Sequence, residues 1–412
     1  MITDVYAYKY ATMRDKPMCL YPFFHQLIKT NGNAMPCCNW DANLLPRLHH
    51  SEFFDSAWMD SVRESMYQDG VPAGCKTCVD CETMGGMSDR DVSHLLGNNI
   101  GVDLSSKPTV LSQEVNLSNI CNLKCRMCDS SRSSKWIPDE AAIGNFSIDS
   151  SYKLTESGWT LANPDTIRHL AFLGGEPFMH QDQISSELSK IKQHGRLGEI
   201  DLYFNTNLTH DFDPVLLGLV LECGKVSINV SIDGYGPLND YIRSDSEWDN
   251  LVENMAKLDE IAKKNGNILW RPVNTLTVFN CNRMHEMYEW FVTAFDTINT
   301  PTTPILAREP RCFSVVNLPL RVKHILLRDY HARLQSASDE YKPHWEALIG
   351  YLNHDPTMTE DLFLREFKKM NGKLDERRST SLKTANPELY TWIEESQIFN
   401  NEMRFDLHDR SL

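Results

Sequence analysis

From residue 114 to residue 318 the sequence alternates short runs typical of strands with longer runs typical of helices. The clearest strand is expected at residues 225–232, where apolar and polar residues alternate so that one face is apolar. The clearest helix begins at Trp248, with apolar residues three and four positions apart and with Ser246 and Asp249 as the expected capping pair. Strands and helices in this order form a parallel sheet with crossover helices, which is an α/β fold.

Six strands are expected in this region, so we predict a partial (β/α)6 barrel similar in plan to a TIM barrel. They are expected at residues 114–118, 169–173, 199–205, 225–232, 268–278 and 312–316. One face of these strands carries more polar groups than can be buried without partners, namely Glu114, Asn116, Asp201, Tyr203, Asn205, Ser227, Asn229 and Ser231. We therefore expect the inside of the barrel to hold a polar ligand, with Glu114, Asp201, Tyr203 and Asn229 as candidates for substrate contact. A sandwich-like sheet with these groups in water is the alternative.

The flanking segments differ from the barrel region. The first hundred residues are rich in Cys, Asn, Gly and Pro, with one amphipathic helix expected near residues 53–67. The carboxyl-terminal part is charged, with helices expected at residues 322–334, 343–352 and 359–370. We therefore expect a cysteine-rich domain at 1–100, the barrel at 110–318 and a helical extension at 319–412. Residues 146–164 show no clear period and are expected to form a loop.

Charge and cysteine usage narrow the class of protein. The chain has 41 Lys and Arg against 56 Asp and Glu, a net charge of -15, which disfavours non-specific binding to nucleic acid. It shows no export signal and no apolar run long enough to cross a bilayer, so we expect a cytoplasmic protein without a membrane partner. In such a compartment the 12 cysteines point to metal or catalysis rather than to disulfides. Cys223, Cys281 and Cys312 stand alone and are expected to be small core residues.

Three cysteines occur together directly after the first expected strand. Cys121, Cys125 and Cys128 have the spacing C-x3-C-x2-C. Three thiolates on one loop can bind three irons of a 4Fe-4S cluster and leave the fourth iron open to another ligand. A zinc ion would require a fourth protein ligand.

This loop resembles the signature of the radical S-adenosylmethionine (SAM) enzymes, and four further motifs resemble that family in the same order. They are Gly174-Gly175-Glu176-Pro177, Thr206-Asn207, Ser231-Ile232-Asp233 and Arg243. The first three follow or end expected strands, at the edge where barrels of this type build their active sites. Leu208 departs from the family pattern, which has a glycine after Thr-Asn.

The resemblance implies a role for each motif. Glu176 would receive the methionyl ammonium group of SAM, Asp233 the ribose hydroxyls, and Arg243 a carboxylate of the cofactor or the substrate. The residues implied in SAM binding are Met127, Gly174, Gly175, Glu176, Asn207, Ser231, Asp233 and Arg243. Those implied in catalysis are Cys121, Cys125, Cys128 and Arg243.

The resemblance also implies an activity. A radical SAM enzyme reductively cleaves SAM to a 5'-deoxyadenosyl radical, which abstracts hydrogen from a substrate. The expected substrate is polar, with a peptide or protein side chain as the leading candidate, and an external flavodoxin or ferredoxin would supply the electron. The rival interpretation is a non-catalytic iron-sulfur electron carrier or redox-responsive binding protein, which would not need all the motifs together.

The amino-terminal cysteines form a second pattern. Cys19 and Cys37 have the spacing C-x12-G-x4-C, and Cys75 precedes Cys78 by three positions. This pattern resembles the SPASM and twitch domains that carry auxiliary iron-sulfur clusters, although those domains follow the barrel and this one precedes it. The resemblance implies a second 4Fe-4S cluster on Cys19, Cys37, Cys75 and Cys78, with Cys38 and Cys81 in reserve. A structural zinc site on the same four thiolates is the alternative.

Overall fold

The computed structural model describes residues 18–68, 71–83, 87–144, 153–298 and 304–396. The chain divides into two compact units. The first unit comprises Met1–Asn119, Thr155–Asn205 and Phe212–Ser227, and the second comprises Ile120–Leu154, Thr206–Asp211 and Ile228–Leu412. The three domains expected from the sequence remain a prediction, and part of the expected loop at 146–164 lies outside the described residues.

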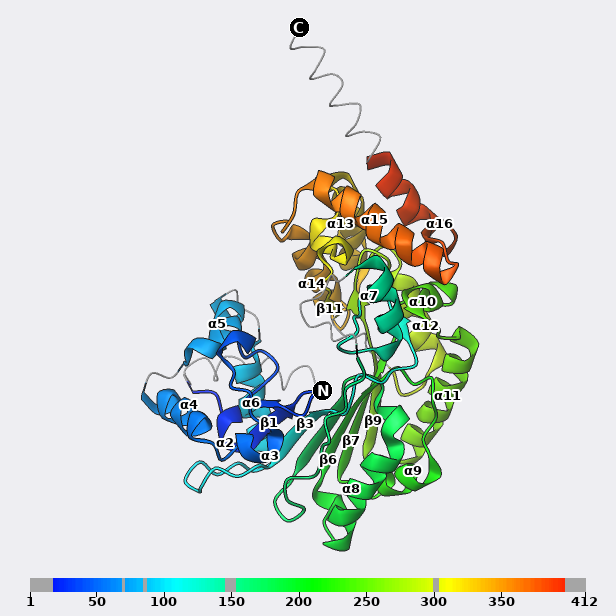
Figure 1. The fold of residues 1–412 in the computed structure, drawn as a ribbon. Coiled ribbons are helices and arrows are strands. Elements are labelled where there is room, and N and C mark those ends of the chain that lie inside the picture. The colour runs from blue at the N-terminus through cyan, green and yellow to red at the C-terminus, as the bar shows by residue number, and fades with distance from the viewer. Residues whose placement is uncertain (1–17, 69–70, 84–86, 145–152, 299–303, 397–412) are drawn as a thin grey trace. The chain divides into compact units, whose positions relative to one another are not determined.

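The described strands include a seven-stranded sheet in the order β2-β1-β3-β5-β6-β7-β9. Its strands are β1 (His25–Ile28), β2 (Ala34–Met35), β3 (Ser112–Asn116), β5 (His169–Leu173), β6 (Asp201–Thr206), β7 (Lys225–Ser231) and β9 (Ile268–Val273). The pairs β1 with β3, β3 with β5 and β5 with β6 are parallel, and β2 runs antiparallel to its neighbour β1. Figure 1 labels β1, β3, β6, β7 and β9 of this sheet, and β5 lies between β3 and β6. A mostly parallel sheet with helices confirms the α/β fold.

Five of the six expected strands are present, with β5 at the expected bounds. The sixth, at 312–316, is wrong, because Arg311–Phe313 and Val315–Asn317 form 3₁₀ turns. Phe313 N–H donates to the carbonyl of Pro310 at 2.7 Å, as in a 3₁₀ turn, while the carbonyl of Phe313 accepts the N–H of Val278 at 2.9 Å. The sequence analysis missed β1, whose four residues are all buried, because two of them are the polar His25 and Gln26.

An apolar core in the first unit, in which Phe24, Phe53 and Met59 have no exposed surface, holds α2, α3 and α4 together. The helices of this unit are α2 (Tyr21–Phe24), α3 (His50–Phe53), α4 (Ala57–Gln68), α5 (Lys76–Thr83), α6 (Asp89–Asn99), α8 (Gln181–Gln193) and α9 (Pro214–Leu221). The single helix expected near 53–67 is thus two, α3 and α4. Ser56 separates them, and its side chain accepts the N–H of Met59 at 3.2 Å.

The second unit contains the short pairs β4 (Lys124–Cys125) with β8 (Arg243–Ser244) and β10 (Thr275–Leu276) with β11 (Ile305–Leu306). Its helices are α7 (Ile137–Ile143), α10 (Pro237–Ile242), α11 (Trp248–Lys264), α12 (Met284–Ala294), α13 (Leu320–Ser336), α14 (Lys342–Asn353), α15 (Glu360–Arg378) and α16 (Leu382–Ala385). In Figure 1 the yellow-to-orange helices α13, α14 and α15 lie together. They match the three helical runs expected after residue 319. None of the described helices is both long and apolar enough to cross a bilayer.

The start of α11 differs from the expected capping pair. Asp240 supplies the cap instead, since its Oδ2 accepts the N–H of Trp248 at 3.1 Å. Ser246 donates its hydroxyl to Asp240 Oδ1 at 2.6 Å and so orients that carboxylate. The cap is therefore a tertiary contact from α10, which the local sequence around Trp248 could not reveal.

Candidate functional site

The segment from Cys121 to Cys128, here called the cysteine loop, is held by backbone bonds within the second unit. In the pairing of β4 with β8, Cys125 lies opposite Arg243. The N–H of Cys128 donates to the carbonyl of Cys125 at 3.0 Å, and the indole N–H of Trp136 donates to the same carbonyl at 2.8 Å. The three cysteines therefore lie on a tight, fixed turn.

Arg243 brings a positive charge to the middle cysteine. Its Nη1 lies 3.8 Å from Cys125 Sγ, and its Nε forms an ion pair with Asp233 Oδ2 at 2.7 Å. Burial raises the pKa of the Cys125 thiol, and the charge of Arg243 acts in the opposite direction. The guanidinium thus favours the thiolate, which is the form of cysteine that binds iron.

Asn207 reaches the first cysteine. Its side-chain N–H donor lies 3.9 Å from Cys121 Sγ and 2.9 Å from Asn122 Oδ1. Asn122 in turn donates to the hydroxyl of Thr209 at 2.7 Å. The turn after β6 and the cysteine loop are therefore joined by amide and hydroxyl bonds.

Leu208 adopts the left-handed backbone conformation, with φ of 52°, where the family pattern has glycine. Its N–H donates to the hydroxyl of Thr206 at 2.9 Å, and its carbonyl accepts from Asn254 at 3.0 Å. The side chain is 1% exposed. Packing and hydrogen bonds thus impose on a leucine a conformation that glycine adopts without strain.

Asp233 is fully buried, and both of its oxygens have partners inside the second unit. Oδ1 accepts the N–H of Thr275 at 2.7 Å, while Oδ2 faces Arg243. Ser231 is half-buried at the end of β7, and Met127 is half-buried in the cysteine loop. In this structure the carboxylate therefore orients Arg243, and its expected role toward a ribose remains a prediction.

The Gly174-Gly175-Glu176 turn lies in the first unit. Gly174 has φ of 73°, and a Cβ there would lie 2.6 Å from the Cβ of Asn116, so no larger residue fits without a shift. Gly175 also has a positive φ, 47°. Glu176 is 1% exposed and accepts the N–H of Phe178 at 2.9 Å. The glycines are thus required by the turn itself.

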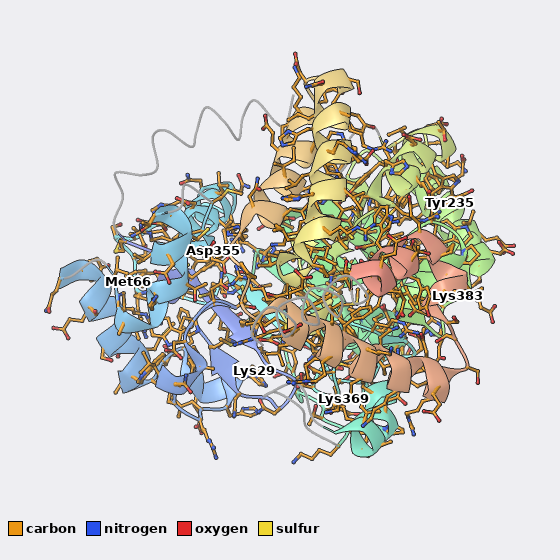
Figure 2. The ribbon with its side chains drawn as sticks, turned by 90° about the horizontal axis from the view of Figure 1, so that it is seen from above. Lys29, Met66, Tyr235, Asp355, Lys369 and Lys383 are labelled. Atoms are coloured by element: carbon orange, nitrogen blue, oxygen red, sulfur yellow. The ribbon has the colours of Figure 1, made fainter. Side chains whose placement is uncertain are left out.

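The four cysteines expected to bind a second cluster line one cavity of the first unit. Its lining comprises Cys19, Cys37, Asn39, Met66, Val71, Cys75, Cys78, Val79, Asp89 and Arg90. Met66 of α4 is labelled in Figure 2. Burial raises the pKa of Cys19 to about 11 and that of Cys75 to about 12, and each of the two thiols also senses the charge of Cys78. Segments far apart in sequence thus converge on one sulfur-lined cavity.

The two reserve cysteines do not line this cavity. The thiol of Cys38 donates to Asp89 Oδ2 at 2.9 Å, and that of Cys81 donates to the carbonyl of Met87 at 3.3 Å. The cavity wall itself is braced by the ion pair of Arg90 with Glu82. The structure therefore separates the reserve pair from the four preferred cysteines.

Two carboxylates of the predicted polar face, Glu114 and Asp201, have different surroundings. Burial and the charge of Asp89 raise the pKa of Glu114 to about 7. Asp201 is the first residue of β6 and lies 3.7 Å from Lys225 Nζ. At about 3.3 Å per residue it lies about 17 Å from Thr206 at the carboxyl end of the strand. Asp201 is therefore placed to stabilise the start of the strand, at the opposite end from Asn207.

Three side chains that support the cysteine loop were not predicted from the sequence. Trp136 binds the carbonyl of Cys125, Arg126 is fully buried, and Arg378 of α15 contacts the ring of Trp136. Of the three, only Arg126 could have been suspected from the sequence, because it lies within the cysteine motif. Its partners Asn371 and Asp375, and also Arg378, are more than 200 residues away in sequence, beyond any local pattern.

The three thiols of the cysteine loop can be compared with the ligands that a zinc ion and a 4Fe-4S cluster require. Within the described ranges no three His, Cys, Asp or Glu side chains form a group able to hold a metal ion. The ligands of a tetrahedral zinc ion bound at 2.3 Å would bring their sulfurs to about 3.8 Å from one another. The thiolates of a four-iron cluster bind separate irons and lie farther apart. Three thiols, two of which lie near N–H donors, are ligands of the kind that a 4Fe-4S cluster requires.

The fold and these residues define an α/β protein with a cysteine loop at the ends of parallel strands. Residues 115–276 match the family model described as the radical SAM superfamily. No curated protein matches the chain.

Two solved structures show weak similarity. A structure described as native anSMEcpe with bound AdoMet is 15% identical, with a TM-score of 0.37, over 59% of this chain and 63% of that chain. SuiB of Streptococcus suis bound to the precursor peptide SuiA is 12% identical, with a TM-score of 0.32, over 88% of this chain and 75% of that chain. The chain thus spans less than two thirds of the length of anSMEcpe, and at these scores the similarity says nothing about substrate.

Proposed function

We propose that this chain is a radical SAM enzyme acting on a polar substrate. The match of residues 115–276 to the radical SAM family model supports the class of chemistry. Cys121, Cys125 and Cys128 would hold a 4Fe-4S cluster. Such a cluster leaves one iron open to SAM and supplies the electron that cleaves SAM to methionine and a 5'-deoxyadenosyl radical.

One observation carries the proposal. Two of the motifs singled out in the sequence bring nitrogen donors to two of the three sulfurs, Asn207 to Cys121 and Arg243 to Cys125. A chance occurrence of Cys-x3-Cys-x2-Cys would give no reason for these later residues to converge on it. Donors of this kind stabilise thiolates and shift the potential of a cluster bound by them.

Different residues of the chain are proposed to bind different groups of SAM and the substrate. Arg243, held by Asp233, keeps a fixed positive charge beside Cys125, where it can also attract a carboxylate of the cofactor or substrate. Glu176 is buried at a glycine turn and offers a carboxylate for the ammonium group of SAM. Met127, Gly174, Gly175, Asn207 and Ser231 complete the proposed binding set.

The finer assignments are part of the same proposal. The favoured substrate is a peptide or protein side chain, and an external flavodoxin or ferredoxin would be the reductant. The sulfur-lined cavity of the first unit supports a second 4Fe-4S cluster on Cys19, Cys37, Cys75 and Cys78. With four protein ligands that cluster would have no open iron, so electron transfer is its proposed task.

The test is anaerobic incubation of the reconstituted protein with SAM and dithionite. We expect 5'-deoxyadenosine from the unaltered chain and none from Cys125→Ala. Cys312→Ala is the matched control, because Cys312 is buried with its thiol 3.6 Å from Met370 Sδ and belongs to none of the motifs. Cluster-loaded protein that yields no 5'-deoxyadenosine would favour the electron-carrier interpretation and overturn the proposal.

A further inference from the structure

The helix α15 contacts the cysteine loop from a part of the sequence to which no function was assigned. Arg126 lies between Cys125 and Met127, is fully buried, and donates to Asn371 Oδ1 at 2.8 Å and to Asp375 Oδ1 at 2.6 Å. Its guanidinium also lies 3.7 Å from the ring centre of Tyr241. All of these residues belong to the second unit. The loop is therefore fixed to α15 by a buried, hydrogen-bonded charge pair.

The last residue of α15 places a second guanidinium near Cys125. Arg378 Nη1 donates to the hydroxyl of Ser244 at 3.2 Å, and Ser244 adjoins Arg243, the residue opposite Cys125. The guanidinium lies 4.5 Å from the ring centre of Trp136, whose N–H binds the carbonyl of Cys125. Arg378 therefore contacts Ser244 and Trp136, the first of which adjoins the residue paired with Cys125 and the second of which binds the carbonyl of Cys125.

The charge of Arg378 is only partly balanced. Its Nε donates to Asp139 Oδ2 at 2.9 Å, but Arg377 Nε donates to the other oxygen of the same carboxylate at 3.0 Å. Two guanidinium groups therefore share one carboxylate. Arg377 has 36% of its side chain exposed and is screened by water, whereas Arg378 has 1% exposed and is not.

Arg378 also has an unused donor. Its Nη2 is buried and has no hydrogen-bond partner in the described structure. Leaving such a group unpaired is costly, and an anionic group bound at the cysteine loop would provide the missing acceptor.

We propose that α15 is part of the cluster site and that Arg378 raises the reduction potential of the cluster that Cys121, Cys125 and Cys128 would hold. This inference rests on the proposed function, since it requires that cluster. Adding an electron makes the cluster more negative, so a nearby unscreened positive charge stabilises the reduced form relative to the oxidised form. Arg378 is a positioning and tuning residue, because the structure shows no contact between it and a reacting atom.

The test is a redox titration followed by the electron paramagnetic resonance signal that Cys125→Ala abolishes. In Arg378→Gln we expect the ratio of reduced to oxidised cluster at a fixed potential to fall about tenfold, equivalent to a midpoint about 59 mV lower for one electron. Arg378→Lys keeps the charge and should stay within about twofold of the unaltered chain. Arg377→Gln is the matched control and should do the same, because its charge is exposed.

The outcomes separate this inference from the proposed function. If the unaltered chain shows no iron signal that depends on Cys125, the proposed function fails. If that signal is present but Arg378→Gln titrates like Arg377→Gln, or Arg378→Lys falls as far as Arg378→Gln, the inference is overturned. Should Arg378→Gln bind no iron, Asp139→Asn decides the matter. Removing this carboxylate should raise the midpoint, and an unchanged or lower value would contradict the role of charge.

Discussion

Arg126 on the cysteine loop donates through Nη2 to Asp375 Oδ1 at 2.6 Å, across 249 positions of sequence. The same Nη2 donates to the hydroxyl of Thr380 at 2.7 Å, and Nε donates to the carbonyl of Tyr241 at 2.9 Å. Because Arg126 is fully buried while Asp375 keeps 18% of its side chain exposed, the arginine depends on this carboxylate for its charge balance. The cysteine loop and α15 should therefore lose their structure together.

Asp375→Asn removes the charge that balances Arg126 and leaves a buried guanidinium. We expect the second unit to lose about 3 kcal/mol of unfolding free energy, which is typical of breaking a buried pair at one partner. Denaturant unfolding followed by tryptophan fluorescence measures this loss. Glu376→Gln is the matched control, because the neighbouring Glu376 is exposed, and it should change stability by less than about 0.5 kcal/mol. Equal losses in both variants would refute the dependence of Arg126 on Asp375.

Asp233→Asn should destabilise the second unit by a similar amount, about 3 to 5 kcal/mol, because Arg243 is then buried without an opposite charge. The asparagine can still accept the N–H of Thr275, so the loss would report the ion pair rather than that bond. Thermal unfolding of the metal-free chain measures it. The control is the exposed Asp249→Asn, for which we expect a change below about 0.5 kcal/mol, since the structure shows no capping pair at that position.

Cys75→Ala should remove the second cluster and leave the first. We expect the anaerobic chain to lose about four irons while it retains the signal that depends on Cys125. Cys38→Ala should keep all the iron, because Cys38 bonds Asp89 and does not line the sulfur-lined cavity. Elemental analysis measures iron and zinc together. Zinc in place of iron at this cavity, lost in Cys75→Ala, would establish the structural zinc alternative.

A buried pair of histidines predicts a pH dependence of stability. Ser112 Oγ lies 2.8 Å from Nδ1 of both His25 and His169, one on each neighbouring strand. Burial lowers the pKa of His25 to about 3 and that of His169 to about 4. Both rings stay neutral when folded but take up a proton near pH 6.5 when unfolded, so their contribution is complete above pH 6.5 and declines from there toward pH 4.

The expected slope is up to about 1.4 kcal/mol per pH unit for each histidine. The double variant His25→Asn and His169→Asn should flatten the decline in melting temperature between pH 7 and pH 5, since asparagine can still bond Ser112 but does not titrate. His331→Asn, at an exposed histidine, is the control and should leave the decline as it was. A decline that is unchanged in the double variant would count against the pair.

Local patterns were sufficient to predict much of the fold. Apolar alternation predicted β7 and helical spacing predicted α11, because one face of each element is buried and the burial repeats along the chain. The strand expected at 312–316 failed because an apolar run satisfies a 3₁₀ turn as well as a strand. The strand β1 was missed because its buried polar residues bond across the sheet, as His25 does with Ser112.

The candidate site shows the same division between local and distant information. The cysteine spacings and the short motifs predicted the candidate site residues, because the residues of each motif lie within a few positions of one another in the sequence. The ion pair of Arg243 with Asp233 and the attachment of Arg126 to α15 depend on segments that meet only after folding. The proximity of Arg378 to the cysteine loop also arises only after folding, so it could not be predicted from the sequence.

The leucine at position 208 limits which residues the turn after β6 can accept. A glycine there would relax the backbone but leave a cavity in place of the isobutyl group, while another large L residue would keep the strain and alter the packing. Relief of backbone strain and filling of the cavity are therefore opposed at this position, and no single replacement achieves both.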